Sequence, residues 1–344
     1  MCSSDLNLCA LLGEFDKAIE QGLRALQIAD TLDDLPLRVV SNGFLAIAHW
    51  SRGEYRPAVA RAGWNVRMLT GDRRLERFGM ALLPSVYSRM AMAVSLAELG
   101  EFDECLALGA EALSIAETSE HPQSVISASF GLGTGHMRRG NLEQAVAVLE
   151  RGRTVAEATA LGGAFLELVS PLASAYARSG RIAQSVELLQ GAIARAVALR
   201  NPMGHWLRSG GLGEAQLCAG RIAQALPMAR LYIEVTRSVG ARGLEAWALL
   251  LLGEVLAQHE SAHAVEAERT LNSALALARQ LEMRPLEGRC HLVFGDLHGR
   301  QGAQERASAS LAAAAEIFRQ LGMAFWLERA EFVVKEARKS IAAS

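Results

Sequence analysis

A short glycine-containing pattern recurs at almost constant spacing and constrains the fold of this chain more than any other feature. A Gly is followed five residues later by a small residue, as in GEFDKA from Gly13 and GNLEQA from Gly140. The other copies begin at Gly53, Gly100, Gly180, Gly220 and Gly302. Successive intervals are 40, 47, 40, 40 and 40 residues, and the last interval of 82 divides into 40 and 42 around Glu260. This spacing predicts an array of about eight repeats rather than independent globular domains.

The residues before each turn also follow a rule. The seventh residue before the turn is always Ala or Gly, and the eighth is a large apolar residue such as Leu45 or Phe294. A position with no side chain beyond Cβ, beside a large apolar one, predicts close contact between two helices. These small residues are Ala46, Ala93, Gly133, Ala173, Gly213, Gly253 and Gly295.

Prolines mark where the first helix of a unit should begin. Five of the eight prolines precede a turn by 16 to 18 residues, which places each of them in the first turn of the predicted helix. The N–H that Pro lacks would have no acceptor within the helix at that position, so Pro costs nothing there. The five prolines are Pro36, Pro84, Pro122, Pro202 and Pro285. Each unit is therefore predicted to be a helix, a short turn, a second helix and a connector.

Composition agrees with a helical array and excludes several other classes of protein. Hydrophobic residues make up 51% of the 344 residues and charged residues 21%, which excludes a disordered chain. A net charge of -2 argues against a nucleic-acid-binding protein. The longest apolar stretch, residues 246–253, is too short to span a bilayer, so no membrane association is expected. The five cysteines form no C-x-x-C pair, which favours a reducing, cytoplasmic setting.

The repeat resembles the tetratricopeptide repeat (TPR), which combines a small residue in its first helix (helix A), a Gly turn and a small residue five positions later. Those later residues are Ala18, Ala58, Cys105, Ala145, Ser185, Ala225 and Ala307. The resemblance covers nearly the whole chain and implies an all-α fold, a right-handed α-solenoid of about eight helix-turn-helix repeats. The period is near 40 rather than roughly 34 residues, which is similar to the longer repeats of bacterial signalling ATPases. The helix-A Trp of the family is absent, and its Tyr is present only as Tyr176.

We expect the array to occupy residues 1–322 and a C-terminal capping helix to occupy residues 323–344. The first repeat is expected to be truncated, because only twelve residues precede Gly13. Such a repeat would expose apolar residues such as Leu8, Leu11 and Leu12, which leaves self-association through this end open. The insert TGDRRLERFG, residues 70–79, is expected to form an extended connector with its arginines in solvent.

No catalytic, cofactor or metal site is predicted. His259 to His263 match the zinc motif H-E-x-x-H, but the repeat places Glu260 at a turn, so the two histidines should lie on either side of a helix break. His49, His136 and His298 each lie four residues before a turn, where they are expected to pack in the repeat core. The glycine clusters at 131–135 and 210–213 lack the strand and the Lys of a phosphate-binding loop.

The resemblance implies a concave groove lined by the helix-A residues of successive repeats. Transferring the family's positions onto this sequence gives a set of aromatic, Met, Arg and Glu residues, which suit a peptide- or protein-binding surface. The predicted groove residues are Trp50, Tyr87, Met90, Phe130, Met137, Arg138, Arg178, Glu214, Trp247 and Glu254. The alternative is that several of them simply pack against the following helix.

Two functions remain open at this point. The first is a non-catalytic protein-protein interaction or regulatory scaffold, whose partner is a protein, a peptide or a neighbouring domain of a larger polypeptide. The closing segment LGMAFWLERAE and the Arg-rich, Lys-poor usage resemble the C-terminal repeat region of bacterial signalling proteins. In those proteins a class III adenylate or guanylate cyclase domain, or a LuxR-type DNA-binding domain, accompanies an ATPase module. The second is a small-molecule or peptide sensor that binds its ligand in the concave groove.

Overall fold

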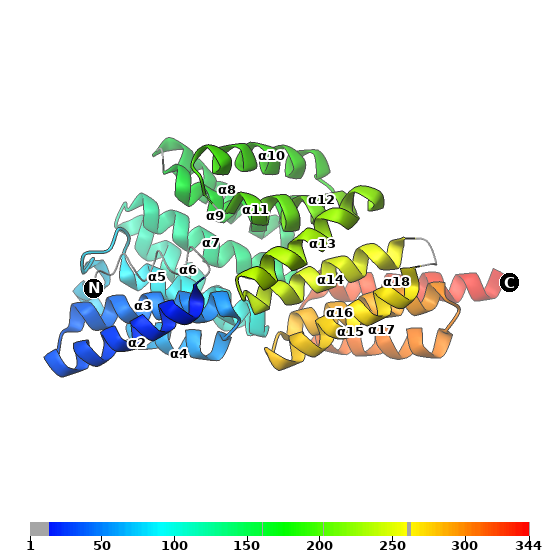
Figure 1. The fold of residues 1–344 in the computed structure, drawn as a ribbon, viewed down its shortest axis with the longest axis horizontal. Coiled ribbons are helices and arrows are strands. Elements are labelled where there is room, and N and C mark those ends of the chain that lie inside the picture. Colours follow the sequence, from blue (N-terminus) through cyan, green and yellow to red (C-terminus); the bar gives the residue numbers. More distant parts are fainter. Residues whose placement is uncertain (1–13, 160, 202, 260–262, 344) are drawn as a thin grey trace.

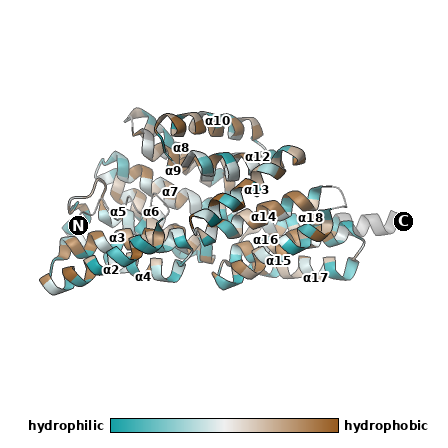
Figure 2. Ribbon diagram, viewed as in Figure 1, coloured by the Kyte–Doolittle hydropathy of each residue, from teal (hydrophilic) through white to brown (hydrophobic). Residues whose placement is uncertain are grey.

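The fold is a continuous array of helical hairpins, seen in a computed structural model that describes residues 14–159, 161–201, 203–259 and 263–343 (Figure 1). Across those ranges the regular elements are helical and none is a strand. Most helices carry both hydrophobic and hydrophilic residues, as a solenoid requires when one face of each helix packs and the other meets water (Figure 2). The predicted all-α solenoid is confirmed.

Each hairpin consists of an A helix, a turn and a B helix. The A helices are α3 (Leu35–Arg52), α5 (Pro84–Leu99), α7 (Pro122–Arg139), α9 (Gly162–Arg178), α14 (Arg242–Gln258) and α16 (Arg284–Arg300). One further A helix is divided into α11 (Met203–Trp206), a π-helical segment (Leu207–Gly211) and α12 (Leu212–Cys218). The B helices are α2 (Phe15–Leu32), α4 (Tyr55–Met68), α6 (Phe102–Thr118), α8 (Leu142–Ala158), α10 (Ile182–Ala198), α13 (Ile222–Ser238), α15 (Ala264–Gln280) and α17 (Gln304–Gln320). The last helix is α18 (Ala324–Ala343).

The turns lie where the repeated glycines predict them. Gly53, Gly100 and Gly140 end their A helices in the left-handed region, with φ between 87° and 97°, a conformation that residues with a Cβ rarely adopt. Pro36, Pro84, Pro122 and Pro285 occupy the first turns of their A helices, as predicted. Gly13, Pro202 and Glu260 lie outside the described residues.

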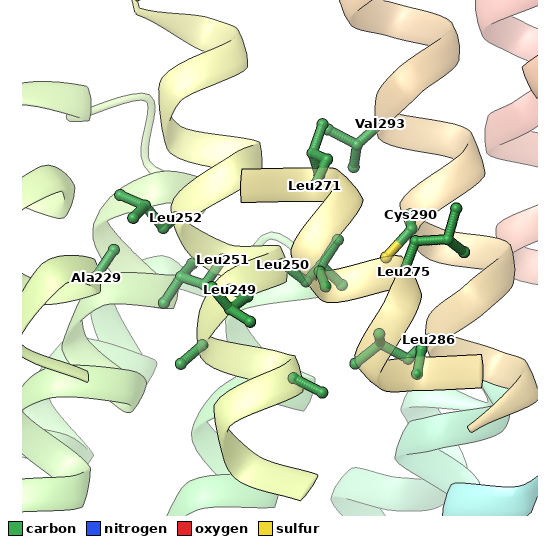
Figure 3. Packing of buried hydrophobic residues seen from close by; sticks show 14 of the residues in the cluster. Ala229, Leu249, Leu250, Leu251, Leu252, Leu271, Leu275, Leu286, Cys290 and Val293 are labelled. Carbon is green, nitrogen blue, oxygen red and sulfur yellow. The ribbon is translucent and has the colours of Figure 1, made fainter. Parts of the chain in front are cut away.

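Close packing between the helices of a hairpin explains the small residue seven positions before the turn. A Cβ on Gly133, Gly253 or Gly295 would overlap the side chain of a Leu that is the eighth residue of the hairpin's B helix. Those partners are Leu149, Leu271 and Leu311. The Gly of one helix thus accommodates the Leu of the other, and Figure 3 shows the leucine-rich core that forms around α14 and α15.

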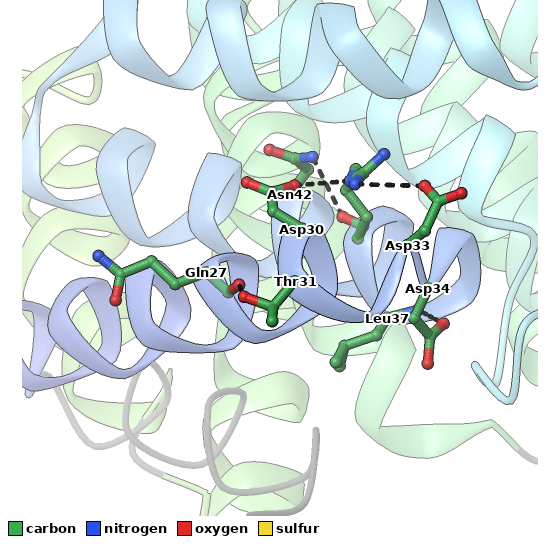
Figure 4. Close-up of polar contacts among 8 residues, drawn as sticks. Gln27, Asp30, Thr31, Asp33, Asp34, Leu37 and Asn42 are labelled. Carbon is green, nitrogen blue, oxygen red and sulfur yellow. Dashed lines mark hydrogen bonds and ion pairs between the residues drawn. The ribbon is translucent and has the colours of Figure 1, made fainter.

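The connectors between hairpins are short, with one exception at residues 69–83. Between α2 and α3, the Asp34 carboxylate caps α3 by accepting a hydrogen bond from the Leu37 N–H at 2.9 Å, and Arg38 pairs with Asp30 at 2.8 Å (Figure 4). The insert at 70–79 is not fully extended, because Gly71–Leu75 form a 3-10 turn that Ser85 holds by donating to the Arg74 carbonyl at 2.6 Å.

The arginines of that insert are not all in solvent. Arg73 and Arg77 are exposed, as predicted, whereas Arg74 is half-buried and its guanidinium lies 3.5 Å from the Glu111 carboxylate. The insert therefore docks on the following hairpin at this one residue.

The superhelix closes on itself after five hairpins. Helix α3 contacts α14, and α5 contacts α16, in each case across an offset of five hairpins. Further along, Arg139 at the end of α7 donates to the Gly322 carbonyl before α18 at 3.2 Å. Arg56 of α4 reaches Glu282 before α16 at 3.2 Å. The first helical residues of the later hairpins therefore pack against the turns of the earlier ones.

Helix α18 follows the last hairpin, and its Trp326 is buried with 4% of its surface exposed. Within the described ranges, no helix has the length and apolar character that crossing a membrane would require.

Candidate functional site in the interior of the superhelix

The closure brings together charged and aromatic residues from seven helices. We call this set the interior cluster, and it consists of Glu98, Arg138, Arg178, Glu214, Trp247, Glu254, Arg289 and Trp326. The repeat explains how they come to share a face, since Glu98, Arg138 and Arg178 each lie two residues before their turn. Successive A helices present equivalent positions to the same side, so these residues all face the superhelix interior.

One end of the cluster is organised by the buried carboxylate of Glu98. It accepts hydrogen bonds from Arg138 Nε at 2.9 Å and from Trp247 Nε1 at 2.8 Å. The Arg138 guanidinium also stacks on the Trp247 ring, 3.9 Å from its centroid. Three helices, α5, α7 and α14, are therefore joined by one carboxylate, one guanidinium and one indole.

The other end of the cluster contains two further ion pairs, Arg178 with Glu214 and Arg289 with Glu254. Both guanidinium groups lie over the Trp326 ring, at 4.9 Å and 4.3 Å from its centroid. Burial would raise the pKa of Glu214, but the positive charges of Arg178 and Arg289 outweigh it and hold that pKa below its usual value. Desolvation, followed by repulsion from Arg178, lowers the pKa of Arg289 to about 10.

The charges of this arrangement are paired across helices. Each carboxylate of the cluster has an Arg partner. Among the residues that the structure describes, no group of three or more His, Cys, Asp or Glu side chains is arranged to hold a metal ion. Inside the protein, the charges of the interior cluster compensate one another.

The remaining predicted groove residues are spread along the A helices. Trp50 and Met137 lie three residues before their turns, whereas Tyr87, Met90 and Phe130 lie further from theirs. Trp50 and Phe130 pack edge to face with ring centroids 6.4 Å apart, and Tyr87 makes a similar contact with Phe44 at 6.1 Å. All four rings are only partly buried. Met90 and Met137 are buried, at 4% and 7% exposed, and Met137 accepts a weak hydrogen bond from the Ser174 hydroxyl at 3.7 Å.

Three cluster members, Glu98, Arg289 and Trp326, were missed by the sequence analysis. The repeat contained a signal for two of them. Glu98 occupies the same position before its turn as Arg138, and Arg289 lies thirteen residues before Gly302, as Tyr87 lies thirteen before Gly100. Trp326 follows the last turn, so no repeat position could have identified it.

A fourth residue that was missed, Glu167 of α9, also lies thirteen residues before its turn. Its side chain is solvent-exposed, yet the surrounding protein desolvates the carboxyl and raises its pKa to about 7.

The histidines agree with the packing interpretation. Helix α14 ends at Gln258 and α15 begins at Ala264, so His259 and His263 lie on either side of a helix break with their rings 4.5 Å apart; residues 260–262 lie outside the described ranges. His49 and His298 are buried, and burial lowers the pKa of the half-buried His136.

The glycine clusters are explained by close helix contacts. A Cβ on Gly133 would overlap Leu149, and a Cβ on Gly135 would lie 2.5 Å from the Cys105 sulfur. Gly210 lies against the ring of Tyr232 in the same way. These glycines are helical or π-helical, so none belongs to a phosphate-binding loop.

Comparison with known proteins identifies the fold only. No protein-family model matches the chain, and no curated protein matches it in sequence. Among solved structures, a Rap protein complexed with Competence and Sporulation Factor has a TM-score of 0.63 at 12% identity, covering 98% of this chain and 97% of that one. Aspartyl phosphate phosphatase F from Bacillus subtilis has a TM-score of 0.53 at 12% identity, covering 85% and 73%. The Rap conjugation gene regulator of plasmid pLS20, in complex with the Phr* peptide, has a TM-score of 0.51 at 10% identity, covering 97% and 96%.

Proposed function

We propose that this chain is a non-catalytic regulatory scaffold that binds a peptide or protein segment on the inner faces of its A helices. The observation that carries the proposal is the set of partly exposed aromatic rings there, Trp50 with Phe130 and Tyr87 with Phe44. Rigid aromatic side chains on a concave surface are the groups that most often dominate peptide-binding energy. Two of the similar solved structures were determined in complex with Competence and Sporulation Factor or with the Phr* peptide, which is consistent with this use of the fold.

The interior cluster supports binding in a different way. Arg138, Arg178 and Arg289 pair with carboxylates on neighbouring A helices, and the contacts of Glu98 and Arg138 with Trp247 join the two turns of the superhelix. Together these contacts fix the shape of the aromatic surface. A fixed surface loses less conformational freedom when a ligand binds. Reversing the charge of Arg138 would place a second carboxylate beside Glu98, so such a variant would test folding rather than ligand contact.

On the sequence resemblance, we extend the proposal to the repeat region of a cytoplasmic bacterial signalling protein, such as one carrying a nucleotide cyclase and an ATPase module. In that setting the bound segment belongs to a neighbouring domain or to a signal peptide. The period near 40 and the closing LGMAFWLERAE support it.

The test is selection from a random-peptide phage library, followed by fluorescence anisotropy with the recovered peptides. Tyr87→Ala and Phe130→Ala should each weaken binding about tenfold or more, as loss of an aromatic anchor does. The matched control is Val265→Ala, because Val265 is an apolar residue on α15 with 82% of its surface exposed. Recovery of no peptide, or of peptides that bind both inner-face variants as tightly as the wild type, would refute the proposal. A small metabolite that stabilises the wild type but not these variants would favour the sensor instead.

A further inference from the structure

The turns of the hairpins fall into two groups, those that later hairpins cover and those that stay open. The turn glycines Gly53, Gly100 and Gly140 are buried, because residues of later hairpins pack against them. Gly180 and Gly220 are exposed, and a Cβ on either would meet no atom within 4 Å in the described part of the chain. We call these last two the open turns. The closure of the superhelix thus leaves the turns of two adjacent hairpins available for a further contact.

One short segment shows how a turn is covered. It is the LEMRPL segment, residues 281–286, which follows α15 directly and runs into α16. Its Leu281 and Pro285 each lie 3.2 Å from the place that a Cβ would take on the first and the second of the buried turn glycines, respectively. Its acid, Glu282, accepts a hydrogen bond from Arg56 at 3.2 Å, beside the first of these turns. A Leu, an acid and a Pro therefore pack on two adjacent turns.

The same pattern occurs a second time where α2 ends and α3 begins, at residues 32–37, which we call the LDDLPL segment. Both segments consist of a Leu, an acid, two variable residues, a Pro and a Leu. In each case the acid is a left-handed residue that follows a B helix, with φ of 49° at Asp33 and 58° at Glu282. The two segments thus carry the same three groups on the same kind of backbone turn.

The two segments differ in how much of them is covered. In the LEMRPL segment the first Leu is half-buried and the Pro is buried. In the LDDLPL segment Leu32 keeps 66% of its surface exposed, and Pro36 is exposed as well. The Asp33 side chain is 97% exposed and lies 3.8 Å from Arg38. The LDDLPL segment therefore presents to solvent the groups with which its counterpart covers turns.

The open turns carry the complementary charge. Each of their glycines is followed by an Arg, Arg181 or Arg221, where the three covered turns have Glu, Glu and Asn. Both arginines are exposed, and their side chains contact the neutral groups of Tyr176 and Gln216. Neither forms an ion pair with a residue that the structure describes. A segment that brings an acid to these turns would find two positive charges without an acidic partner.

We propose that copies of this chain associate head to tail, with the LDDLPL segment of one copy on the open turns of the next. Leu32 and Pro36 then cover the two glycines, and Asp33 pairs with the arginines that follow them. Because the two surfaces differ, each copy offers one of each, so the contact builds a ring or an open row of molecules. The contact uses the turns rather than the inner faces of the A helices, so it goes beyond the proposed function and does not depend on it.

The test is charge reversal on each surface separately, followed by light scattering and sedimentation equilibrium from micromolar to hundreds of micromolar protein. The connector variant is Asp33→Arg, and Arg is known to fit there because Arg200 has the same left-handed conformation after α10, with φ of 51°. The turn variant is Arg181→Glu with Arg221→Glu, which gives the open turns the residue that two covered turns already have.

A matched control carries the same charge change away from both surfaces. It is Arg67→Glu with Arg269→Glu, since both residues are exposed and lie within the B helices α4 and α15. The mean mass of the wild type and of the control should rise with concentration. Each reversed variant should associate about tenfold more weakly or less, because like charges then face each other. Circular dichroism checks that each variant is folded.

Mixing the two reversed variants in equal amounts gives the decisive result. The new Arg of the connector variant meets the acidic turns of the other, whose own Asp33 meets the unchanged arginines of the first, so association should return. A wild type that stays monomeric over the whole range would overturn the proposal. So would reversed variants that associate as the wild type or the control does, or a mixture that remains monomeric, since the two surfaces would then not meet.

Discussion

Replacing Glu98 by Ala should destabilise the protein by about 3 kcal/mol, because it removes the acceptor that joins three helices. The side chains of Glu98 and Arg138 are only 6% and 17% exposed, so the guanidinium would be left with little access to water and no carboxylate. The Trp247 N–H would lose its acceptor as well. Breaking a buried ion pair costs about 3 to 5 kcal/mol of stability. We expect a loss at the lower end of this range, because Arg138 keeps its cation–π contact with the Trp247 ring.

The assay is urea unfolding followed by both circular dichroism and tryptophan fluorescence, to which Trp247 at the closure contributes as one of five tryptophans. The matched control is Glu101→Ala, three residues further along, which breaks the 2.5 Å ion pair with Arg56. Those two side chains are 39% and 51% exposed, so this loss should be below about 1 kcal/mol. The double variant Glu98→Ala, Arg138→Leu should recover part of the stability, because it leaves no unpaired charge.

Equal effects of Glu98→Ala and Glu101→Ala would refute the reasoning, because burial would then not distinguish the two carboxylates. A double variant less stable than Glu98→Ala alone would refute it too, by showing that Arg138 stabilises the closure without its acid.

Two further predictions concern single residues. Gly295→Ala should destabilise the protein by about 1 to 3 kcal/mol, because the new Cβ overlaps Leu311, whereas Gly191→Ala, with no atom within 4 Å of the new Cβ, should stabilise it by about 0.5 to 1 kcal/mol. Thermal unfolding measures both, and destabilisation by the two alike would contradict the packing rule. Because the pKa of Glu167 is raised to about 7, its contribution to stability should be lost as the pH rises from about 4.5 through 7. The melting temperature of Glu167→Gln relative to wild type should therefore rise over that window, and parallel melting curves from pH 4.5 to 8.5 would contradict this.

The hairpins could be predicted from the sequence because their determinants are local. A Gly such as Gly140 must take a positive φ at the turn, and a small residue such as Gly133 must face a neighbouring Leu, so each unit carries its own signature. The division of one A helix by the π-helical segment Leu207–Gly211 was not predicted, although Gly210 lies there against Tyr232.

The site was predicted only in part, for a different physical reason. Repeat positions identified five of the cluster residues, including Arg138 and Trp247, because equivalent positions on A helices face the same side. The ion pairs join neighbouring A helices, but the contacts of Glu98 and Arg138 with Trp247 depend on the small rotation between hairpins accumulated over three or four units, which no single repeat encodes. The contact between Arg138 and Trp247, 109 residues apart, is therefore visible only in the folded chain.

The closure after five hairpins limits how this protein can evolve. In an open solenoid a duplicated or deleted repeat adds or removes one unit and leaves the other contacts intact. Here an extra unit between α8 and α9 would shift every later hairpin by one place, so that Glu98 would no longer meet Trp247 and the Gly140 turn would no longer meet Trp326. Unit number is thus fixed by the same contacts that shape the interior, and variation should be confined to connectors such as residues 70–79.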